Sequence, residues 1–283
     1  MLATGHYDNW PTQGRPPLLR NNMLTQQTIT DDLRRLGVQS DDALVVHSSL
    51  RSLGKVDGGA NTVIAALRDA IGPNGLLVFP TFTYYTQVFD PAIDPCQTGT
   101  IPETGRSWPG AVRSWHPTHS AAAIGNGAES LCEGHHLVGG NGLGSPLDKL
   151  AARGGNILLL GVGHNANSTI HVGESHAGVA YLDIPFSADS FSTATVITPG
   201  GPIEVTLKYP SGCSKAFGAV EKTLRDRGQV RDGIVGAALA QWVKSQAVID
   251  ATIDMLSADP GGLLCTDPHC YRCTQSRERL KNS

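Results

Sequence analysis

Residues 43–80, ALVVHSSLRSLGKVDGGANTVIAALRDAIGPNGLLVFP, decide the fold class of this 283-residue chain. The stretch opens and closes with short apolar runs, residues 43–47 and 76–79, which are typical of buried parallel strands. Between them, residues 59–71 have the apolar spacing of a helix, which a Gly-Pro pair then ends. Parallel strands need a crossover connection of this kind, and such crossovers are right-handed. The stretch therefore predicts one strand-helix-strand unit of an α/β protein.

Further runs extend this unit into a larger α/β fold. Residues 156–160, NILLL, predict a third buried strand that leads through a loop into a helix. We therefore expect a central, largely parallel sheet that is flanked by helices. Residues 194–198 and 203–207 lie on either side of a Pro-Gly-Gly-Pro turn, which predicts a mixed or antiparallel extension. Additional helices are predicted over residues 25–36, 214–227 and 233–256.

The chain divides into a leader, a folded domain and a tail. The leader, residues 1–24, contains several prolines and glycines, and we expect it to be flexible. The folded domain spans residues 25–258, which is long enough to bury a core without disulfides. Residues 259–283 form a tail that contains three of the six cysteines. This distribution of cysteines does not resemble a secreted disulfide framework.

Charge and hydropathy exclude several classes of partner. The formal net charge is -3, and no run of Lys or Arg creates a basic surface, so we expect binding to neither nucleic acid nor an anionic membrane. No run approaches the roughly 20 apolar residues of a membrane span, and the N-terminus lacks the apolar core of a signal peptide. We expect a cytoplasmic enzyme that acts on small molecules. The sequence leaves its oligomeric state open.

The strongest chemical signal is the motif NSTIHVGE, residues 167–174, directly after the third predicted strand. Ligands of open parallel sheets bind beyond the carboxyl ends of the strands, so a helix that begins there presents its first turns to the site. Ser168 or Thr169 suits the N-cap of this helix, which places His171 and Glu174 on one face. A histidine with a carboxylate neighbour at such a place favours a general base. The alternative is a surface histidine with a helical neighbour.

Residues 46–60 join a strand to a helix through hydroxyl residues and glycines. Free backbone amides at the start of a helix favour an anion, which is most often a phosphate. The segment contains neither a Walker A loop nor a GxGxxG motif, which argues against a nucleoside triphosphatase. The alternative is an ordinary strand-to-helix turn.

Residues 110–125 bring together an arginine, two serines and two histidines. Arg113 suits a phosphate better than a lysine does, because its planar guanidinium can donate two parallel hydrogen bonds. The spacing of His116 and His119 matches no common zinc pattern, so we expect both rings to stabilise a loop.

The tail offers soft metal ligands in a short span. Cys265, Cys270 and Cys273 could hold zinc as thiolates, with His269 or another group as the fourth ligand. Structural zinc sites usually combine two separated ligand pairs, whereas this cluster is compact. The alternative is a set of free thiols on a C-terminal tail.

Three segments of the chain carry a resemblance to a known family. They are VHSSLRSLGKVDGGANTVIAALRDAIGPNGLLVFPTFTY from residue 46, GAVRSWHPTHSAAAIG from residue 110, and GSPLDKLAARGGNILLLGVGHNANSTIHVGE from residue 144. Together they resemble the aminoglycoside 3-N-acetyltransferase family, and the resemblance extends over about residues 25–250.

The resemblance implies acetyl-CoA as the donor and an amine as the acceptor, with His171 as the base and Glu174 beside it. In this reading residues 25–258 are the acetyltransferase domain. The candidate donors to the developing oxyanion are the amides of residues 48–50. The residues expected to contact CoA are His47, Ser48, Ser49, Leu50, Val56, Gly58, Gly59, Ala60, Thr81, Arg113, Ser114 and Ser120.

The acceptor site is less defined by the sequence. Glu174, Asp183 and Tyr84 are the candidate contacts of the acceptor, and Asp189 is a further nearby acid. A polycationic aminoglycoside needs several carboxylates to bind tightly, and few acidic residues surround the motif. We therefore expect a small amine acceptor, whether aminoglycoside-like or another antibiotic, without broad, high-level aminoglycoside resistance.

Two other functions are weighed against amine acetylation. A thioester hydrolase could use Ser48 or Ser49 as its nucleophile, but the segment lacks a Gly-x-Ser-x-Gly elbow. A non-catalytic module that binds CoA is the second alternative, against which the intact residues 169–174 argue.

Overall fold

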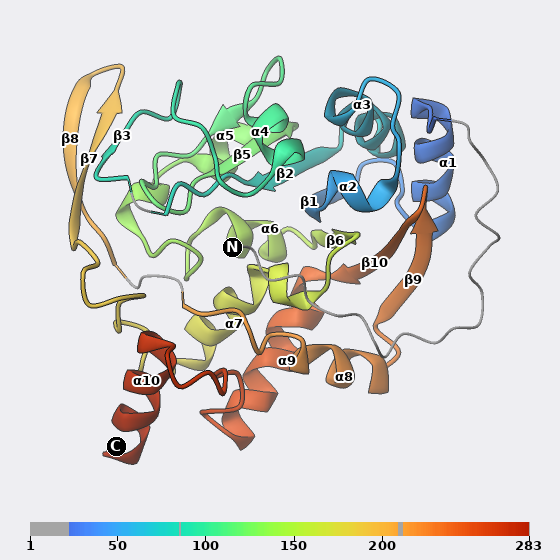
Figure 1. Cartoon of the computed structure of the whole chain (residues 1–283). Helices are drawn as coiled ribbons and strands as arrows, with labels where there is room; N and C mark the ends of the chain where they lie inside the picture. The colour runs from blue at the N-terminus through green and yellow to red at the C-terminus, as the bar shows by residue number, and fades with distance from the viewer. Residues whose placement is uncertain (1–22, 85, 209–211, 283) are drawn as a thin grey trace.

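The computed structural model describes residues 23–84, 86–208 and 212–282. Figure 1 shows the elements of the chain in sequence order, from α1 to α10. They are α1 (Gln26–Leu36), β1 (Ala43–Ser48), α2 (Leu50–Leu53), α3 (Ala60–Ile71), β2 (Leu76–Pro80), β3 (Val88–Phe89), α4 (Thr100–Arg106), β4 (Val112–Arg113), β5 (Ala121–Gly125), α5 (Ala128–Cys132), η1 (His135–Leu137), α6 (Pro146–Ala152), β6 (Asn156–Leu160), η2 (His164–Ala166), α7 (Thr169–Ala177), β7 (Thr193–Thr198), β8 (Gly201–Thr206), α8 (Ala219–Asp226), β9 (Val230–Val235), β10 (Ala238–Lys244), α9 (Ser245–Ala258) and α10 (Tyr271–Lys281).

The main sheet of the described residues has the strand order β4-β5-β2-β1-β6-β10-β9. Its three central strands, β2, β1 and β6, run parallel, while β5 and β10 pair antiparallel to their outer edges. The α/β class and the parallel strand-helix-strand unit are therefore confirmed. Counted by strand pairs, the sheet is mostly antiparallel, because the outer strands on both sides reverse direction.

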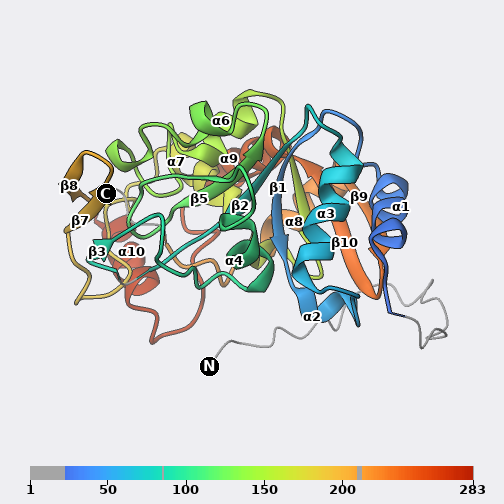
Figure 2. The ribbon, with the colours of Figure 1, turned by 90° about the horizontal axis from the view of Figure 1, so that it is seen from above.

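Helices cover both faces of this sheet, which Figure 2 shows edge-on between α1 and α3 on one side and α6, α7 and α9 on the other. Successive residues of a strand point to opposite faces. Leu44 and Val46 accordingly pack in the cluster that includes α1 and α3, whereas Val45 packs in the cluster that includes α7 and α9. Because both faces are buried, the central strands are continuously apolar instead of alternating.

The second sheet consists of β3, β7 and β8. The antiparallel pairing of β7 with β8 confirms the hairpin expected around residues 194–207. Strand β5 was not predicted, because its sequence AAAIG is mostly alanine and contains a single β-branched residue, Ile124.

The prediction of a helix over residues 233–256 is wrong for residues 233–244. β9 and β10 form an antiparallel hairpin there, and only α9 is helical. Gly236, with φ 60°, supplies the left-handed conformation of the turn between the two strands. Trp242 pairs with Leu158 of β6, so pairing at the sheet edge prevails over the helical spacing of the apolar residues.

The other predicted boundaries have mixed outcomes. α1 is confirmed, and the helix predicted over residues 214–227 begins later, at Ala219. Most of the leader, residues 1–22, lies outside the described residues, and Leu24 pairs with Val56 in a parallel bridge. Within the described residues, no helix combines the length and apolar character needed to cross a bilayer.

Several histidines are buried in the neutral form, and His135 illustrates the cause. Its Nε2 lies 2.8 Å from the carbonyl oxygen of Gly140, which only accepts, so this nitrogen carries the proton. Its Nδ1 accepts from the hydroxyl of Ser114 at 2.8 Å, and that hydroxyl oxygen accepts from the amide of Ala121. Burial lowers the pKa of His135 to about 3. Burial also lowers the pKa of His47 and of His119 to about 3.

We predict that the fold loses stability as the pH falls from 6.5 toward about 3. In this pH window His135 binds a proton in the unfolded chain but not in the folded protein, so protonation favours unfolding. Above pH 6.5 the stability that the neutral ring contributes is fully present. His135→Gln keeps a donor for Gly140 and cannot titrate. Its free energy of unfolding should vary less steeply with pH, by up to about 1.4 kcal/mol per pH unit. Urea unfolding across this range measures both slopes, and equal slopes would contradict the prediction.

Candidate active site at the strand ends

Helix α7 carries the predicted catalytic motif and begins just after β6 and η2. Ser168 occupies the N-cap position, as expected, but the side chain that caps the backbone is Asn167, whose Oδ1 accepts from the amide of Thr169 at 3.1 Å. α7 packs tightly on α9, because a Cβ on Gly173 would lie 2.5 Å from the Cβ of Thr252. The glycine of the motif therefore lets α7 lie close against the core, which fixes the position of its first two turns.

His171 and Glu174 form a direct, buried pair. The Nδ1 of His171 lies 2.6 Å from the Oε2 of Glu174, and the two residues are 9% and 4% exposed. An ionised carboxylate can accept hydrogen bonds but cannot donate them, so the proton of the neutral imidazole lies on Nδ1. The Nε2 of His171 then holds a lone pair and can accept a proton from a substrate. The structure brings the two predicted catalytic residues into the geometry that a general base requires.

Two residues from distant segments lie near His171. The ring of Phe217, which precedes α8, meets the imidazole edge-to-face with 4.6 Å between centroids. His119 lies close enough for its charge to interact with that of His171, and burial together with this neighbour lowers the pKa of His119 to about 3. The predicted segment 113–120 therefore does approach the motif of residues 167–174, through a neutral histidine.

The charge of Glu174 interacts with two buried residues that the sequence did not indicate. Tyr181 is 1% exposed, and its pKa is raised by burial first and then by the charge of Glu174. Arg272 of α10 is 3% exposed; burial lowers its pKa, and the charge of Glu174 opposes this effect. No motif could have identified Arg272, because it lies among the cysteines of the tail and reaches this region only through folding.

The strand-to-helix segment after β1 has features that suit an anionic ligand. Gly58 and Gly59 have φ angles of 73° and 62°, which side chains rarely adopt, and they lead directly into α3 at Ala60. The free amides at the start of this long helix can bind a phosphate. The hydroxyl of Ser48 is buried and has no hydrogen-bond partner among the described residues. A buried hydroxyl without a partner is a reason to expect a ligand there.

One of the candidate oxyanion donors is already engaged. The amide of Ser49 donates to the carbonyl oxygen of Leu160 at 2.9 Å, which ties the end of β1 to the end of β6. This amide therefore cannot also stabilise an oxyanion, and that part of the expectation is corrected. His47, one residue before Ser48, is buried and neutral, since burial and then the neighbouring His164 lower its pKa to about 3.

Four residues expected to contact CoA lie in buried hydrogen-bond networks. Arg113 donates to the hydroxyl of Ser120 at 3.0 Å and to the carbonyl oxygen of Thr81 at 2.9 Å, and it also reaches the carbonyl oxygens of Pro91 and Asp94. Burial lowers its pKa to about 10. Ser114 is bound to His135, as described above. These groups hold loops together, and their contact with CoA stays a prediction.

Of the candidate acceptor contacts, Glu174 is buried, whereas Tyr84 and Asp183 are exposed. Tyr84 is 42% exposed, and its ring lies 5.8 Å from that of His119. Asp183 forms an ion pair with Arg279 of α10, so this carboxylate already has a cationic partner. Asp189 lies in the loop between α7 and β7. The structure thus brings Tyr84 toward the catalytic region and gives Asp183 a competing partner.

Comparison with known proteins gives a consistent result along most of the chain. Residues 45–257 match the family model described as aminoglycoside 3-N-acetyltransferase. An aminoglycoside N(3)-acetyltransferase III of Acinetobacter baumannii is 38% identical over 280 residues, which cover 87% of this chain and 96% of the relative. An aminoglycoside N(3)-acetyltransferase IV of Salmonella is 32% identical over 81% of this chain and 85% of the relative.

Solved structures agree with this result. A histidine-to-alanine variant of the aminoglycoside acetyltransferase AAC(3)-IVa, in complex with a gentamicin, superimposes with a TM-score of 0.81 at 29% identity, and the match covers 92% of this chain and 99% of that chain. AAC-IIIb, in a binary complex with CoASH, superimposes with a TM-score of 0.75 at 28% identity over 84% of this chain and 97% of that chain.

We predict that Arg113→Ala mainly destabilises the fold. Removing a buried guanidinium leaves several carbonyl oxygens without a donor and creates a cavity, which costs on the order of 3 kcal/mol. Urea unfolding should report this loss, and Arg51→Ala, a change at a more exposed arginine, serves as the control. If unfolding were unchanged while CoA bound less tightly in calorimetry, Arg113 would instead be a ligand of the phosphates.

Proposed function

The chain belongs to the aminoglycoside 3-N-acetyltransferase family, and we propose that it transfers the acetyl group of acetyl-CoA to an amino group of a small antibiotic, with His171 as the general base. Its relatives are named as acetyltransferases, and the chain is an acyltransferase. The observation that carries the proposed mechanism is the buried hydrogen bond of 2.6 Å between His171 and Glu174. This bond directs the free nitrogen of the imidazole away from the carboxylate and toward a substrate.

The proposed reaction needs one proton acceptor and a precise alignment of two substrates. The Nε2 of His171 removes a proton from the acceptor amine as the amine nitrogen attacks the thioester carbonyl. A C–N bond forms, the C–S bond breaks, and the proton returns to the sulfur that leaves. Glu174 stabilises the imidazolium that exists between these two proton transfers. Alignment of the substrates supplies on the order of 7 to 11 kcal/mol of the reduction in the barrier.

The proposed donor site lies at the carboxyl ends of β1 and β6. Support comes from the helix start at Ala60, from the positive φ angles of Gly58 and Gly59, and from the buried hydroxyl of Ser48. The complex of AAC-IIIb with CoASH supports CoA as the donor for a chain of this fold. The residues of the segments 47–60 and 113–120 that touch CoA remain part of this proposal.

Aminoglycosides are the acceptor class that the family supports, since related structures contain a gentamicin and apramycin. The charges of this chain favour modest affinity for such polycations. Glu174 is paired with His171, and Asp183 is paired with Arg279, so neither carboxylate is free of a partner. Exposed ion pairs contribute at most about 1 kcal/mol each, so several free carboxylates are needed for tight binding.

We predict that His171→Ala lowers kcat/KM by at least about a hundredfold while acetyl-CoA still binds. The variant lacks the proton acceptor, but the proposed donor site lies on other segments. His176→Ala is the matched control, because His176 is on the same helix, is exposed and pairs with Asp148. Release of CoA, followed with a thiol reagent, measures turnover. Turnover at the wild-type rate in His171→Ala would remove His171 from the mechanism.

Glu174→Gln should be milder than His171→Ala, with a decrease in kcat of about tenfold. The amide oxygen can still accept from the imidazole and orient it, but it no longer stabilises the imidazolium by charge. The Michaelis constant of the acceptor should stay unchanged if the carboxylate only supports His171. A large rise in that constant would assign Glu174 a direct contact with the acceptor amine.

We predict amine-dependent release of CoA with only part of a panel of aminoglycosides, and little release without an amine. The pairing of Glu174 and Asp183 within the protein weakens the binding of polycations, and this weakness should also limit the resistance of a bacterial host that expresses the chain. Purified-enzyme kinetics and inhibitory concentrations test both statements. Low-micromolar Michaelis constants for every aminoglycoside would contradict the first, and release without an amine would indicate a hydrolase.

A further inference from the structure

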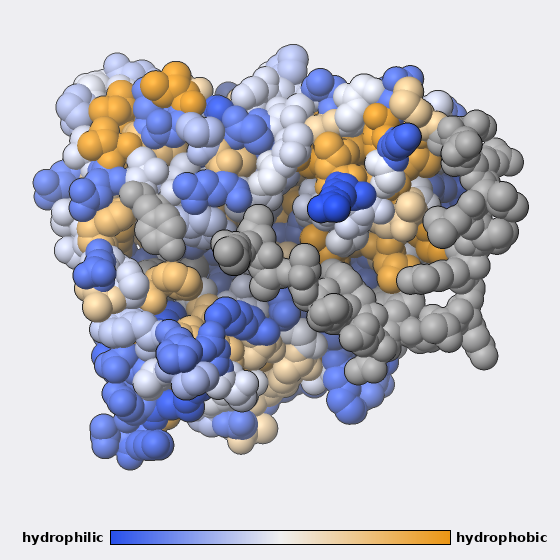
Figure 3. Space-filling model, in the orientation of Figure 1, coloured by the Kyte–Doolittle hydropathy of each residue, from blue (hydrophilic) through white to orange (hydrophobic). Residues whose placement is uncertain are grey.

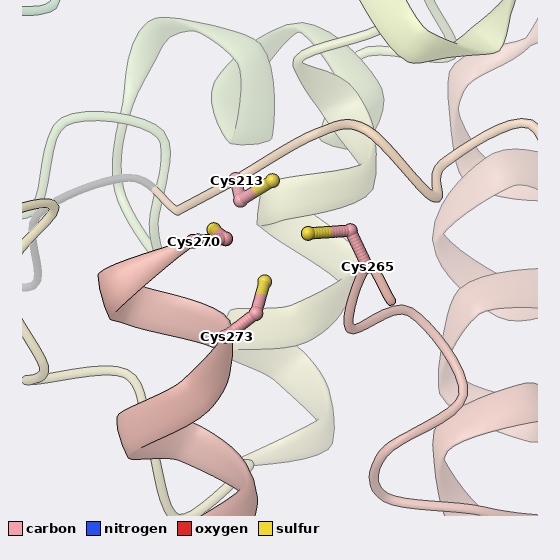
Figure 4. A group of neighbouring side chains, drawn as sticks. All are labelled: Cys213, Cys265, Cys270 and Cys273. Carbon is pink, nitrogen blue, oxygen red and sulfur yellow. The ribbon is translucent and has the colours of Figure 1, made fainter. Parts of the chain in front are cut away.

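Four cysteines from three segments meet beside α7. Cys213 precedes α8, Cys265 follows α9, and Cys270 and Cys273 lie at the start of α10. Their sulfur atoms all lie within 4.8 Å of one another, and Figure 4 shows that the four side chains converge on a common point. Cys213, Cys265 and Cys273 are buried, and all four cysteines are free thiols.

We infer that these four thiolates bind a structural zinc ion. A zinc ion about 2.3 Å from each of four tetrahedral sulfurs places the sulfurs about 3.8 Å apart, which requires only a small contraction of the observed cluster. The sequence indicated Cys265, Cys270 and Cys273 and left the fourth ligand open. The structure supplies Cys213 as this ligand, and His269 is not part of the group. Four protein ligands leave no open position, so the site is structural and not catalytic.

The donor set favours zinc over other metals. Four thiolates in a tetrahedral arrangement suit zinc or iron, whereas magnesium and calcium require oxygen ligands. Zinc binds more tightly than ferrous iron at a given site of this kind. Acetyl transfer involves no change of oxidation state, so an electron-transfer iron has no role in this chain.

The surroundings compensate the charge that such a site would carry. A zinc ion with four thiolates has a net charge of -2. Arg272 is buried and lies in the sequence between Cys270 and Cys273. Arg277 donates a hydrogen bond to the carbonyl oxygen of Cys265 at 2.7 Å. The backbone amide of Lys215 donates a hydrogen bond to the sulfur of Cys213 at 3.5 Å. These donors and cations suit an anionic cluster better than they suit four neutral thiols.

Helix α10 has little apolar surface to hold it against the rest of the protein. Its sequence, YRCTQSRERLK, has few apolar residues, and its buried residues are Arg272, Cys273 and Ser276. Figure 3 shows hydrophilic side chains over this part of the surface, at the lower left. An isolated helix of this length is marginal in water, and the burial of so little apolar surface adds little stability. A metal that joins α10 to two other segments supplies the missing attachment.

The zinc site would also connect the tail to the catalytic pair. Cys213 begins the short segment that ends at Phe217, whose ring lies against His171. Arg272, whose charge interacts with Glu174, lies between Cys270 and Cys273. Residues 45–257 match the family model, so three of the four ligands lie beyond the matched region. The site would therefore attach a tail that carries Arg272, whose charge interacts with that of Glu174 in α7.

The test is the metal content of the full chain, measured by inductively coupled plasma mass spectrometry after expression in zinc-containing medium. We expect about one zinc ion per chain. Cys273→Ser should lose nearly all of it, whereas Cys132→Ser should keep it, because Cys132 is a buried cysteine of the core outside the cluster. Cys270→His offers a replacement ligand at the half-buried position and should retain zinc better than Cys270→Ser.

The wild-type protein provides measurements that do not depend on how well the variants fold. Exchange of zinc for Co²⁺ should produce the visible absorption bands of tetrahedral cobalt thiolate. Removal of zinc by a chelator should expose α10 to trypsin, which can cut at Arg277, Arg279 and Lys281. Iron in place of zinc, disulfides among the four cysteines, or equal zinc content in Cys273→Ser and Cys132→Ser would overturn the inference. None of these measurements uses acetyl transfer, so they are independent of the proposed activity.

Discussion

Burial of both faces of the parallel strands β2, β1 and β6 governs the architecture of the chain. Alternate residues of β1 pack into opposite layers of helices, which holds the sheet between them. Because β1 and β6 are parallel neighbours, their carboxyl ends lie at the same edge, and the Ser49 amide bonds to Leu160 there. The two segments with chemical signals, residues 46–60 and 167–174, leave the sheet at this edge. The proposed donor site and the proposed base therefore leave the sheet at the same edge because of strand direction.

Polar groups around this edge are satisfied mainly from within the protein. The Arg113 guanidinium binds carbonyl oxygens and Ser120, and Ser114 binds a neutral His135. Such networks stabilise loops because each buried donor has an acceptor. Buried groups that lack a hydrogen-bond partner among the described residues include the hydroxyls of Ser48 and Thr169 and Nε2 of His47.

The C-terminal tail completes the region around the catalytic pair. Phe217 and Arg272 approach His171 and Glu174 from segments that the cluster of four cysteines joins. Phe217 is held by the core, whereas α10 buries only Arg272, Cys273 and Ser276 and so has little apolar surface to hold its position. A zinc ion at the cluster would make the tail part of the folded unit and would hold Arg272 in its buried position, where its charge interacts with that of Glu174.

Local sequence patterns are enough to predict the α/β class, the three central strands and the His171-Glu174 pair, because buried strands and helix starts leave signals in composition and spacing. The same patterns wrongly predict a helix over residues 233–244, because the apolar spacing there suits a helix as well as a strand. Pairing with β6 makes this segment a strand. The roles of Arg113, Cys213 and Arg272 depend on partners far away in the chain, which no local pattern encodes. The packing of distant segments determines which polar residues are buried and which thiols come together. Each of these contacts joins parts of the chain that are remote in sequence.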